Sequence, residues 1–165
     1  MTTRHQYRLE LSTFSPTGHS SPPDNLDIRS QLAEELDKLA DLMLDAYRGT
    51  RDYDNETLED ARQEVPNFIN GNIGIPLLEY SKICLHERAV ISACLLSIWD
   101  EIQLPLVSYV MTGAAWKGRS LAGVLLNESL FCIITHGYSI IHAFITQGNT
   151  LSEMLFSRAQ FQLIS

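Results

Sequence analysis

The 165 residues of this chain carry 12 basic and 20 acidic side chains, for a formal net charge of −8, and 45% of the residues are hydrophobic. This length and apolar content suit a single globular domain over residues 1–165, and the acidic balance argues against nucleic acid as a partner. The N-terminus has no apolar signal segment and no uncharged apolar run reaches membrane-spanning length, so we expect a cytoplasmic protein without membrane contact.

The first half of the chain predicts one strand and two helices. Residues 7–14 alternate in polarity, as a half-buried strand does, and a Pro-, Gly- and Ser-rich linker is expected over residues 15–29. A helix is expected from Ser30 to Arg48 and a second one from Thr57 to Asn70. Pro66 should kink or restart the second helix.

The second half of the chain is richer in strands. Three apolar strands are expected in succession, and Glu87-Arg88 suits a tight hairpin between the first two. A long helix, a strand, a short helix and a last strand then follow. The expected ranges are 79–86, 89–99 and 104–112 for the three strands, then 118–136, 138–146, 150–158 and 161–164. This order indicates an α/β fold with a mixed, mostly antiparallel twisted sheet flanked by helices.

Cysteine and histidine give no sign of a metal site. Cys84, Cys94 and Cys132 stand among apolar residues and form no CxxC pair, which indicates reduced core residues. The five histidines lack helical metal-ligand spacing, so we expect no bound metal. A catalytic cysteine is the alternative interpretation.

The segment from Val110 to Ala122 has the features of an anion site. An apolar strand ends, small residues turn the chain, and Lys117 and Arg119 flank a glycine before a long apolar helix. The first N–H groups of a helix lack internal partners and carry the positive end of its dipole. Small residues let a phosphate approach them. The segment therefore suits a pyrophosphate, and the alternative is an ordinary turn whose basic side chains face water.

The same segment resembles the acetyl-coenzyme A (acetyl-CoA) loop of the GNAT acetyltransferase superfamily, Arg/Gln-x-x-Gly-x-Gly/Ala. Lys117 stands at the Arg/Gln position and Ser120 at the central Gly. Ala122 stands at the final Gly/Ala, so one of the three positions matches outright.

A second, downstream segment, residues 145–161, is similar to the pattern Asn-x-x-Ala-x-x-Leu-Tyr of the same superfamily. Asn149 matches the Asn and Ser152 stands at the small residue. Phe156 replaces the tyrosine.

The resemblance implies a GNAT-like fold in which strands 104–112 and 138–146 splay apart to admit acetyl-CoA. It also implies an N-acetyltransferase, in which a primary amine of a small molecule or peptide attacks the thioester directly. The cofactor would be held by the backbone of one strand end, by loop N–H groups and by the short helix. These residues are Val110, Met111 and Thr112; Lys117, Gly118, Arg119, Ser120, Leu121 and Ala122; and Asn149, Ser152 and Phe156.

The catalytic groups are harder to assign. Phe156 cannot donate a proton, although relatives usually carry a tyrosine acid at that position. The strand 104–112 has no carboxylate, although some relatives carry a glutamate there. Tyr109 is a candidate acid, and Asp100 and Glu101, just before the strand, are candidate bases acting through water. Packing for Tyr109 and solvated strand ends for the two acids are the alternatives.

On the acceptor side, the resemblance places Tyr47, Asp52 and Asp54 near the mouth of the site, and Glu79 is a further candidate carboxylate. Two other functions stay open from the sequence. One is a GNAT-like module that binds or senses acyl-CoA without turnover, which the missing tyrosine favours. The other is an α/β interaction protein that forms a homodimer through residues 89–99 and the C-terminal strand.

Overall fold

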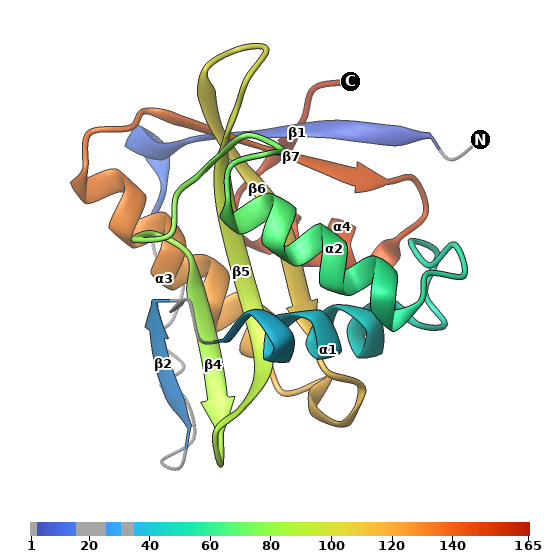
Figure 1. Ribbon diagram of the computed structural model, residues 1–165. Helices are drawn as coiled ribbons and strands as arrows, with labels where there is room; N and C mark the ends of the chain where they lie inside the picture. The colour runs from blue at the N-terminus through green and yellow to red at the C-terminus, as the bar shows by residue number, and fades with distance from the viewer. Residues whose placement is uncertain (1–2, 16–25, 31–34) are drawn as a thin grey trace.

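The computed structural model describes residues 3–15, 26–30 and 35–165, which form eight strands and four α-helices (Figure 1). The strands are β1 (Arg4–Glu10), β2 (Asp27–Ser30), β3 (Ile75–Pro76), β4 (Lys82–His86), β5 (Ala89–Trp99), β6 (Leu104–Thr112), β7 (Ile140–Thr146) and β8 (Gln162–Leu163). The helices are α1 (Leu36–Tyr47), α2 (Leu58–Ile69), α3 (Leu121–Thr135) and α4 (Thr150–Arg158), with short 3-10 turns η1 (Leu11–Thr13) and η3 (Ala114–Trp116).

The strands form one sheet in the order β2-β4-β5-β6-β7-β1-β8, and β3 pairs with the end of β5. Neighbouring strands are antiparallel except β6 and β7, which are parallel and are connected through α3. Parallel neighbours need a long crossover, and the apolar run of residues 121–135 supplies a helix for it. The mixed, mostly antiparallel sheet that the sequence predicts is confirmed.

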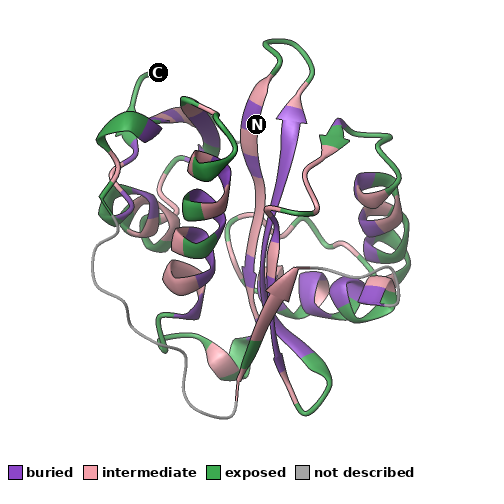
Figure 2. Cartoon of the chain, turned by 90° about the vertical axis from the view of Figure 1, so that its left-hand side faces the viewer, coloured by how far each residue is buried: buried purple, intermediate pink, exposed green. Residues whose placement is uncertain are grey.

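Helices cover both faces of this sheet, so two apolar cores form (Figure 2). On one face, α1 and α2 bury Leu39 and Phe68 against the sheet. On the other face, α3 buries Leu125, Leu130 and Ile133. Burial of one such side chain stabilises the fold by roughly 1.5–3 kcal/mol, and together these contacts hold α1 and α2 on one side of the strands and α3 on the other.

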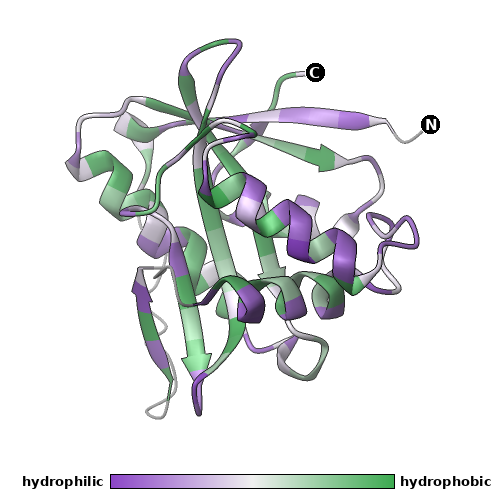
Figure 3. Cartoon of the chain, in the orientation of Figure 1, coloured by the Kyte–Doolittle hydropathy of each residue, from purple (hydrophilic) through white to green (hydrophobic). Residues whose placement is uncertain are grey.

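The central strand β5 is buried on both faces. Leu95 points to the core under α1 and α2, and Leu96 points to the core under α3. Such a strand is a continuous hydrophobic run, as Figure 3 shows. Because β4 and β6 pair with β5 along its two edges, the strand offers no free edge to a second copy. The interpretation that residues 89–99 form a dimer interface is therefore wrong.

Local sequence signals explain the hairpin and the start of α2. Glu87 and Arg88 have φ values of 47° and 70°, the left-handed pair typical of a two-residue hairpin. The Thr57 hydroxyl accepts a hydrogen bond from the Asp60 N–H at 3.2 Å, and the Asp60 carboxylate accepts one from the Thr57 N–H at 2.7 Å. This reciprocal pair is a capping box, and it fixes the first turn of the helix.

One prediction about the first half of the chain is wrong, and a second is wrong as to a restart of the helix. Residues 27–30 form β2, paired with β4, where the sequence predicted linker and a helix start. In α2, the helix continues through Pro66 without a restart. Pro66 has no N–H to donate to the carbonyl of Arg62 one turn earlier. Because Arg62 is exposed, water can donate to that carbonyl instead. The rest of the expected linker (16–25) and the expected first helical turn (31–34) lie outside the described residues.

Boundaries elsewhere shift for local reasons. β1 begins at Arg4 and ends at Glu10, where η1 follows in place of the expected strand end. α3 begins at Leu121, because Gly118 and Ser120 have φ values of +81° and +62°, which no right-handed helix contains. No helix within the described ranges is long and apolar enough to cross a membrane.

Candidate functional site

The parallel strands β6 and β7 part after a short pairing. They pair only at Leu106 with His142 and at Val107 with Ala143, and beyond these pairs the two strands diverge as the sequence predicts. Two cavities border this opening. The two cavities share lining residues from β6, α1, the α1–α2 loop and the β7–α4 region, and so they meet at the opening; the shared residues are Tyr47, Asp52, Val110, Asn149 and Ser152.

A β-bulge lies at the point of divergence. On β5, Leu96 faces Val107 and the next residue, Leu95, faces Tyr109, so Ser108 is the extra residue on β6. Side chains alternate between the faces of a strand, and one extra residue reverses the alternation. Val107 belongs to the core under α3, whereas Tyr109 packs with the core under α1 and α2. The bulge therefore turns Tyr109 toward α2.

The larger cavity, of about 540 Å³, lies between the β6–α3 loop and α4, and we call it the loop cavity. Ten residues that the sequence assigned to cofactor binding line it. They are Val110, Met111, Thr112, Lys117, Gly118, Ser120, Leu121, Ala122, Asn149 and Ser152. Two further assigned residues do not: Phe156 lines the other cavity, and Arg119 stacks on Trp116.

The β6–α3 loop presents a run of free backbone N–H groups. Among the described residues, no hydrogen-bond acceptor meets the N–H groups of residues 117–123. Gly118 and Ser120 both have left-handed φ values, and such alternation turns neighbouring N–H groups toward one concave side. α3 then adds the positive end of its dipole at Leu121. This geometry suits an anion with several oxygens.

Ser120 occupies a backbone position that favours glycine. Its φ of 62° lies in the left-handed region, which costs a residue with a Cβ about 1 kcal/mol. Its hydroxyl makes no capping hydrogen bond with α3. The serine at the central glycine of the motif therefore keeps the backbone shape that the glycine would give.

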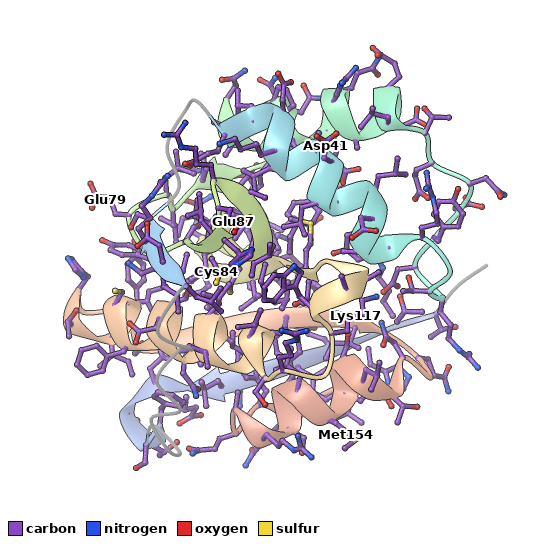
Figure 4. The ribbon with its side chains drawn as sticks, turned by 90° about the horizontal axis from the view of Figure 1, so that it is seen from below. Asp41, Glu79, Cys84, Glu87, Lys117 and Met154 are labelled. Carbon is purple, nitrogen blue, oxygen red and sulfur yellow. The ribbon has the colours of Figure 1, made fainter. Side chains whose placement is uncertain are left out.

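The two basic side chains of the loop have protein partners. Lys117 Nζ donates to the carbonyl oxygen of Ala46 at 2.9 Å, at the C-terminal end of α1, which has no basic residue in its last turn. Figure 4 shows Lys117 close to that helix. The Arg119 guanidinium lies 4.6 Å from the ring centroid of Trp116. Lys117 therefore fastens the loop to α1, and the backbone N–H groups of the loop stay available to an anion.

A carboxylate from the α1–α2 loop crosses the mouth of the opening. Asp52 accepts hydrogen bonds from the Thr146 hydroxyl and, at 2.8 Å, from the Asn149 side-chain amide. Asn149 also caps α4 by accepting from the Ser152 N–H at 3.3 Å. Asp52 thus ties the α1–α2 loop to the end of β7 where the two cavities meet.

The smaller cavity, of about 360 Å³, lies between β6, α1 and α2, and we call it the α2 cavity. Tyr109 lines it and donates a hydrogen bond from its hydroxyl to Glu64 Oε1 at 2.6 Å. Burial and this hydrogen bond raise the pKa of Tyr109 well above its ordinary value. Burial, with the negative charges of Asp52 and Glu64, also raises the pKa of Tyr47. Both phenols therefore stay protonated at neutral pH.

The other assigned side chains lie apart from these cavities. Asp100 and Glu101 are exposed in the turn between β5 and β6, and Asp54 is exposed in the α1–α2 loop; none of the three lines either cavity. Glu79 is also exposed and lies at the periphery, well away from Lys117 (Figure 4). The structure brings Tyr109, Tyr47 and Asp52 together and leaves these four carboxylates outside.

Glu64 is the functional candidate that the sequence interpretation missed. α2 buries Ala61, Val65 and Phe68, and Glu64 falls three residues after the first and four before the last. Residues three and four apart share a helix face, so Glu64 interrupts an apolar stripe that points inward. A carboxylate in such a stripe is the signal that could have found it.

Metal and thiol chemistry find no support in the described residues. No group of three His, Cys, Asp or Glu side chains there is arranged to hold a metal ion. Burial raises the pKa of the Cys94 thiol to about 12 and that of Cys84 to about 11. Since the thiolate is the nucleophile, these two cysteines are unsuited to catalysis at neutral pH.

Solved structures are similar to this chain over most of its length. A GCN5-related N-acetyltransferase from Sphaerobacter thermophilus superposes with a TM-score of 0.73 at 14% identity, covering 99% of this chain and 49% of that protein. This chain therefore spans about half the length of that relative.

Two further similar structures contain ligands. The aminoglycoside N-acetyltransferase AAC(6')-Iy in complex with CoA superposes with a TM-score of 0.63 at 13% identity, covering 86% of this chain and 90% of that one. The same enzyme with a bisubstrate analog, CoA-S-monomethyl-acetylneamine, gives 0.61 at 14% identity, covering 83% and 90%. No family model matches this sequence, and no curated protein does. At these identities the similarity establishes the fold.

Proposed function

Because the chain has the fold of the GCN5-related N-acetyltransferases, we propose that it transfers the acetyl group of acetyl-CoA to a primary amine of a small molecule or peptide. One observation carries this proposal. The free N–H groups of residues 117–123 border the loop cavity, and this cavity meets the α2 cavity where β6 and β7 part. A donor bound in the loop cavity can thus reach an acceptor bound in the α2 cavity.

The residues around the loop cavity suit CoA. The N–H groups of the β6–α3 loop match a pyrophosphate, because an anion at a helix N-terminus meets both free donors and the helix dipole. Val110, Met111 and Thr112 border the path from the loop to the opening, where the edge of β6 that β7 leaves unpaired can bind the amides of the pantetheine arm. When bound, the cofactor supplies the acetyl thioester. The structures of AAC(6')-Iy with CoA support this choice of donor.

The α2 cavity suits an amine as the acceptor. Its lining includes three carboxylates, Asp52, Glu56 and Glu64, against one cation, Arg4. A cavity lined mostly by negative charge raises the local concentration of a cation. Aromatic rings complete the walls, and a ring face attracts an ammonium group; the rings are those of Tyr47, Tyr53, Phe68, Tyr109, Phe144 and Phe156.

A second candidate function is an acyl-CoA-binding module without turnover. Phe156 favours it, because this buried ring lines the α2 cavity where relatives usually carry a tyrosine acid. A thiolate is a better leaving group than an amine anion, however, so the reaction can proceed without a side-chain acid at this point. Acetyl transfer is therefore the function that we favour.

Two measurements test the proposal. Acetyl-CoA should raise the melting temperature in a saturable manner, because a ligand that binds only the folded state stabilises it, by about 2.7 kcal/mol at 100 times Kd. Thiol release should then be followed with 1,4-diaminobutane, neamine and a dipeptide as acceptors. Stabilisation with thiol release supports the enzyme, and stabilisation without thiol release for any amine supports the binding module. A melting temperature that acetyl-CoA leaves unchanged contradicts both.

A further inference from the structure

Glu64 is held in the α2 cavity by the fold around it. Its position on the inward stripe of α2 leaves the side chain half-buried beside Val65 and Phe68. A carboxylate in apolar surroundings is unfavourable unless a donor satisfies it. The Tyr109 hydroxyl is that donor, and the bulge at Ser108 is what turns Tyr109 to the same side of the sheet.

The Glu64–Tyr109 pair is rigid. The Tyr109 ring packs edge-on against Phe68 with centroids 5.5 Å apart, so the phenol is fixed by packing as well as by its hydrogen bond. Only Oε1 of Glu64 is used by the tyrosine. Oε2 has no hydrogen-bond partner within the part of the chain that the structure describes, so one oxygen of a positioned carboxylate is free to accept a proton in the cavity.

The other two carboxylates of the cavity are less suited to this work. Both oxygens of Asp52 already accept hydrogen bonds, from Thr146 and Asn149. Glu56 lies in the α1–α2 loop and accepts from the Asp54 N–H at 2.7 Å, so it belongs to a loop turn. Among the three, Glu64 alone lies on a helix, has a fixed hydrogen-bond partner for one carboxylate oxygen and has a second oxygen that no described residue contacts by a hydrogen bond.

We propose that Glu64 is the catalytic base that takes the proton from the acceptor ammonium, and that Tyr109 is the positioning residue that holds Glu64 in place. This inference rests on the proposed acetyltransferase function and assigns the group that prepares the amine for attack. The position of Tyr109, one residue from Val110 at the junction of the two cavities, places the pair next to the opening through which the thioester is reached.

The protons and electrons of the step balance. The bound ammonium gives one proton to Glu64 Oε2 and becomes a neutral amine. Its lone pair forms the C–N bond with the acetyl carbon, the C–S bond breaks, and the electron pair stays on sulfur. The second proton lost by the nitrogen goes to that sulfur, so the products are an amide and a thiol. Glu64 returns its proton to water.

Charged and titratable groups surround Glu64 from every neighbouring element. The groups that line the same cavity are Arg4 of β1, Tyr47 of α1, Asp52, Tyr53 and Glu56 of the α1–α2 loop and Tyr109 of β6. The phenols of Tyr47 and Tyr109 stay neutral over the working pH range, because burial raises the pKa of each. The acidic limb is the fall in rate at low pH. If only one variant lacks this limb, the residue replaced in that variant is the base.

The central test compares Glu64→Gln with the wild type and with Glu59→Gln, a matched control on the exposed N-terminal turn of the same helix. With the best of the three amines, Glu64→Gln should lower kcat by roughly 100-fold, the lower end of the range for a lost general base. Acetyl-CoA affinity should stay within about twofold of wild type, since the change lies outside the loop cavity. Glu59→Gln should behave as the wild type.

The pH profile separates a base from a structural residue. Wild-type kcat/KM should show an additional fall at low pH as the base becomes protonated. Glu64→Gln should lack this additional fall and follow only the neutral fraction of the amine, which rises with pH. The deficit of Glu64→Gln should also shrink as the pH approaches the pKa of the free amine, about 10 for an alkylamine, because the amine then arrives already neutral. A variant that is merely misfolded would lose activity equally at every pH.

Tyr109→Phe is the second variant, and it tests the positioning role without removing the carboxylate. It should lower kcat by roughly fivefold to tenfold, leave KM for acetyl-CoA unchanged and keep the acidic limb, because the carboxylate of Glu64 is still present. Glu64→Asp, which keeps a carboxylate on a shorter side chain, should recover part of the rate lost in Glu64→Gln.

The outcomes are distinguishable. If the wild type binds acetyl-CoA and releases thiol while Glu64→Gln keeps its rate and its acidic limb, the assignment of Glu64 is wrong and the proposed function stands. If Glu64→Gln does not fold, the other two variants decide. The assignment is overturned if the rate profile of Tyr109→Phe lacks the acidic limb. It is also overturned if Glu64→Asp folds and is as inactive as buffer. If the wild type releases no thiol with any amine, the proposed function fails and the assignment fails with it.

Discussion

The two cavities of this protein are built in different ways. The loop cavity presents main-chain N–H groups from residues 117–123, shaped by left-handed φ values at Gly118 and Ser120. The α2 cavity presents side chains, chiefly Tyr109 and Glu64. A site made of backbone tolerates substitutions that keep the backbone shape, so the proposed anion-binding role of this loop is compatible with one match in three motif positions. A site made of side chains depends on each of them.

Outside the Glu64–Tyr109 pair, the largest expected effect comes from a charge placed in the loop cavity. Ala122→Glu should weaken acetyl-CoA binding by roughly thirtyfold, about 2 kcal/mol, because it sets a carboxylate beside the pyrophosphate. Titration calorimetry measures this. Ala115→Glu adds the same charge at an exposed position outside the loop cavity and should change affinity far less. Equal losses in both variants would mean that net charge, and not the loop, governs binding.

The tie between the two cavities comes next. Asp52→Ala removes the hydrogen bonds to Thr146 and Asn149 and should lower the free energy of unfolding by about 1–2 kcal/mol, measured by denaturant titration. Asp54→Ala, two residues along in the same loop and exposed, should change it by less than about 0.5 kcal/mol. A stable Asp52→Ala variant would show that the α1–α2 loop is held by other contacts.

A smaller effect is expected at the aromatic wall of the α2 cavity. Phe156→Tyr adds a hydroxyl to a ring that is 5% exposed and packs edge-on against Phe161. It should raise kcat by roughly two- to fivefold, because a phenol near the sulfur can protonate the leaving thiolate, with acetyl-CoA affinity unchanged. Steady-state kinetics with one amine checks both values. A fall in kcat with intact binding would show that the site is not arranged around a phenol.

The smallest effect tests the backbone shape of the loop. Ser120→Gly should raise the free energy of unfolding by about 0.5 kcal/mol, because relief of left-handed strain exceeds the added entropy of the unfolded chain. Acetyl-CoA affinity should stay the same, since the N–H groups keep their places. Ser157→Gly, within the right-handed α4, should instead be destabilising by about 0.5–1 kcal/mol. A destabilised Ser120→Gly variant would mean that the hydroxyl is needed.

The sequence predicted the features that depend on local residues and missed those that depend on contacts between distant residues. β5 and β6 were predicted with their observed limits, because long apolar runs between tight turns leave little choice of boundary. The turn before α3 was also predictable, since its small and basic residues are local in the chain; its role as an anion site stays a prediction. β2 was missed, because this four-residue strand, Asp27–Ser30, carries one apolar residue and gains its structure from pairing with β4.

The Glu64–Tyr109 pair could not be assembled from the sequence. The two residues are 45 positions apart, and their contact depends on the bulge at Ser108, which reverses the side-chain alternation of β6. A bulge is a property of two paired strands and leaves no pattern in either one alone. The expectation that Asp100 and Glu101 serve as bases came from closeness along the chain, and the structure places both in an exposed turn outside the cavities.

Amide NMR can show whether backbone N–H groups of the β6–α3 loop bind the pyrophosphate of CoA. In a titration of the isotopically labelled protein with CoA, we expect saturable shifts of the amide resonances of Gly118, Ser120, Leu121 and Ala122, with the β2–β4 pair unaffected. Saturable binding that leaves those four resonances in place would contradict this expectation, as would the absence of any binding.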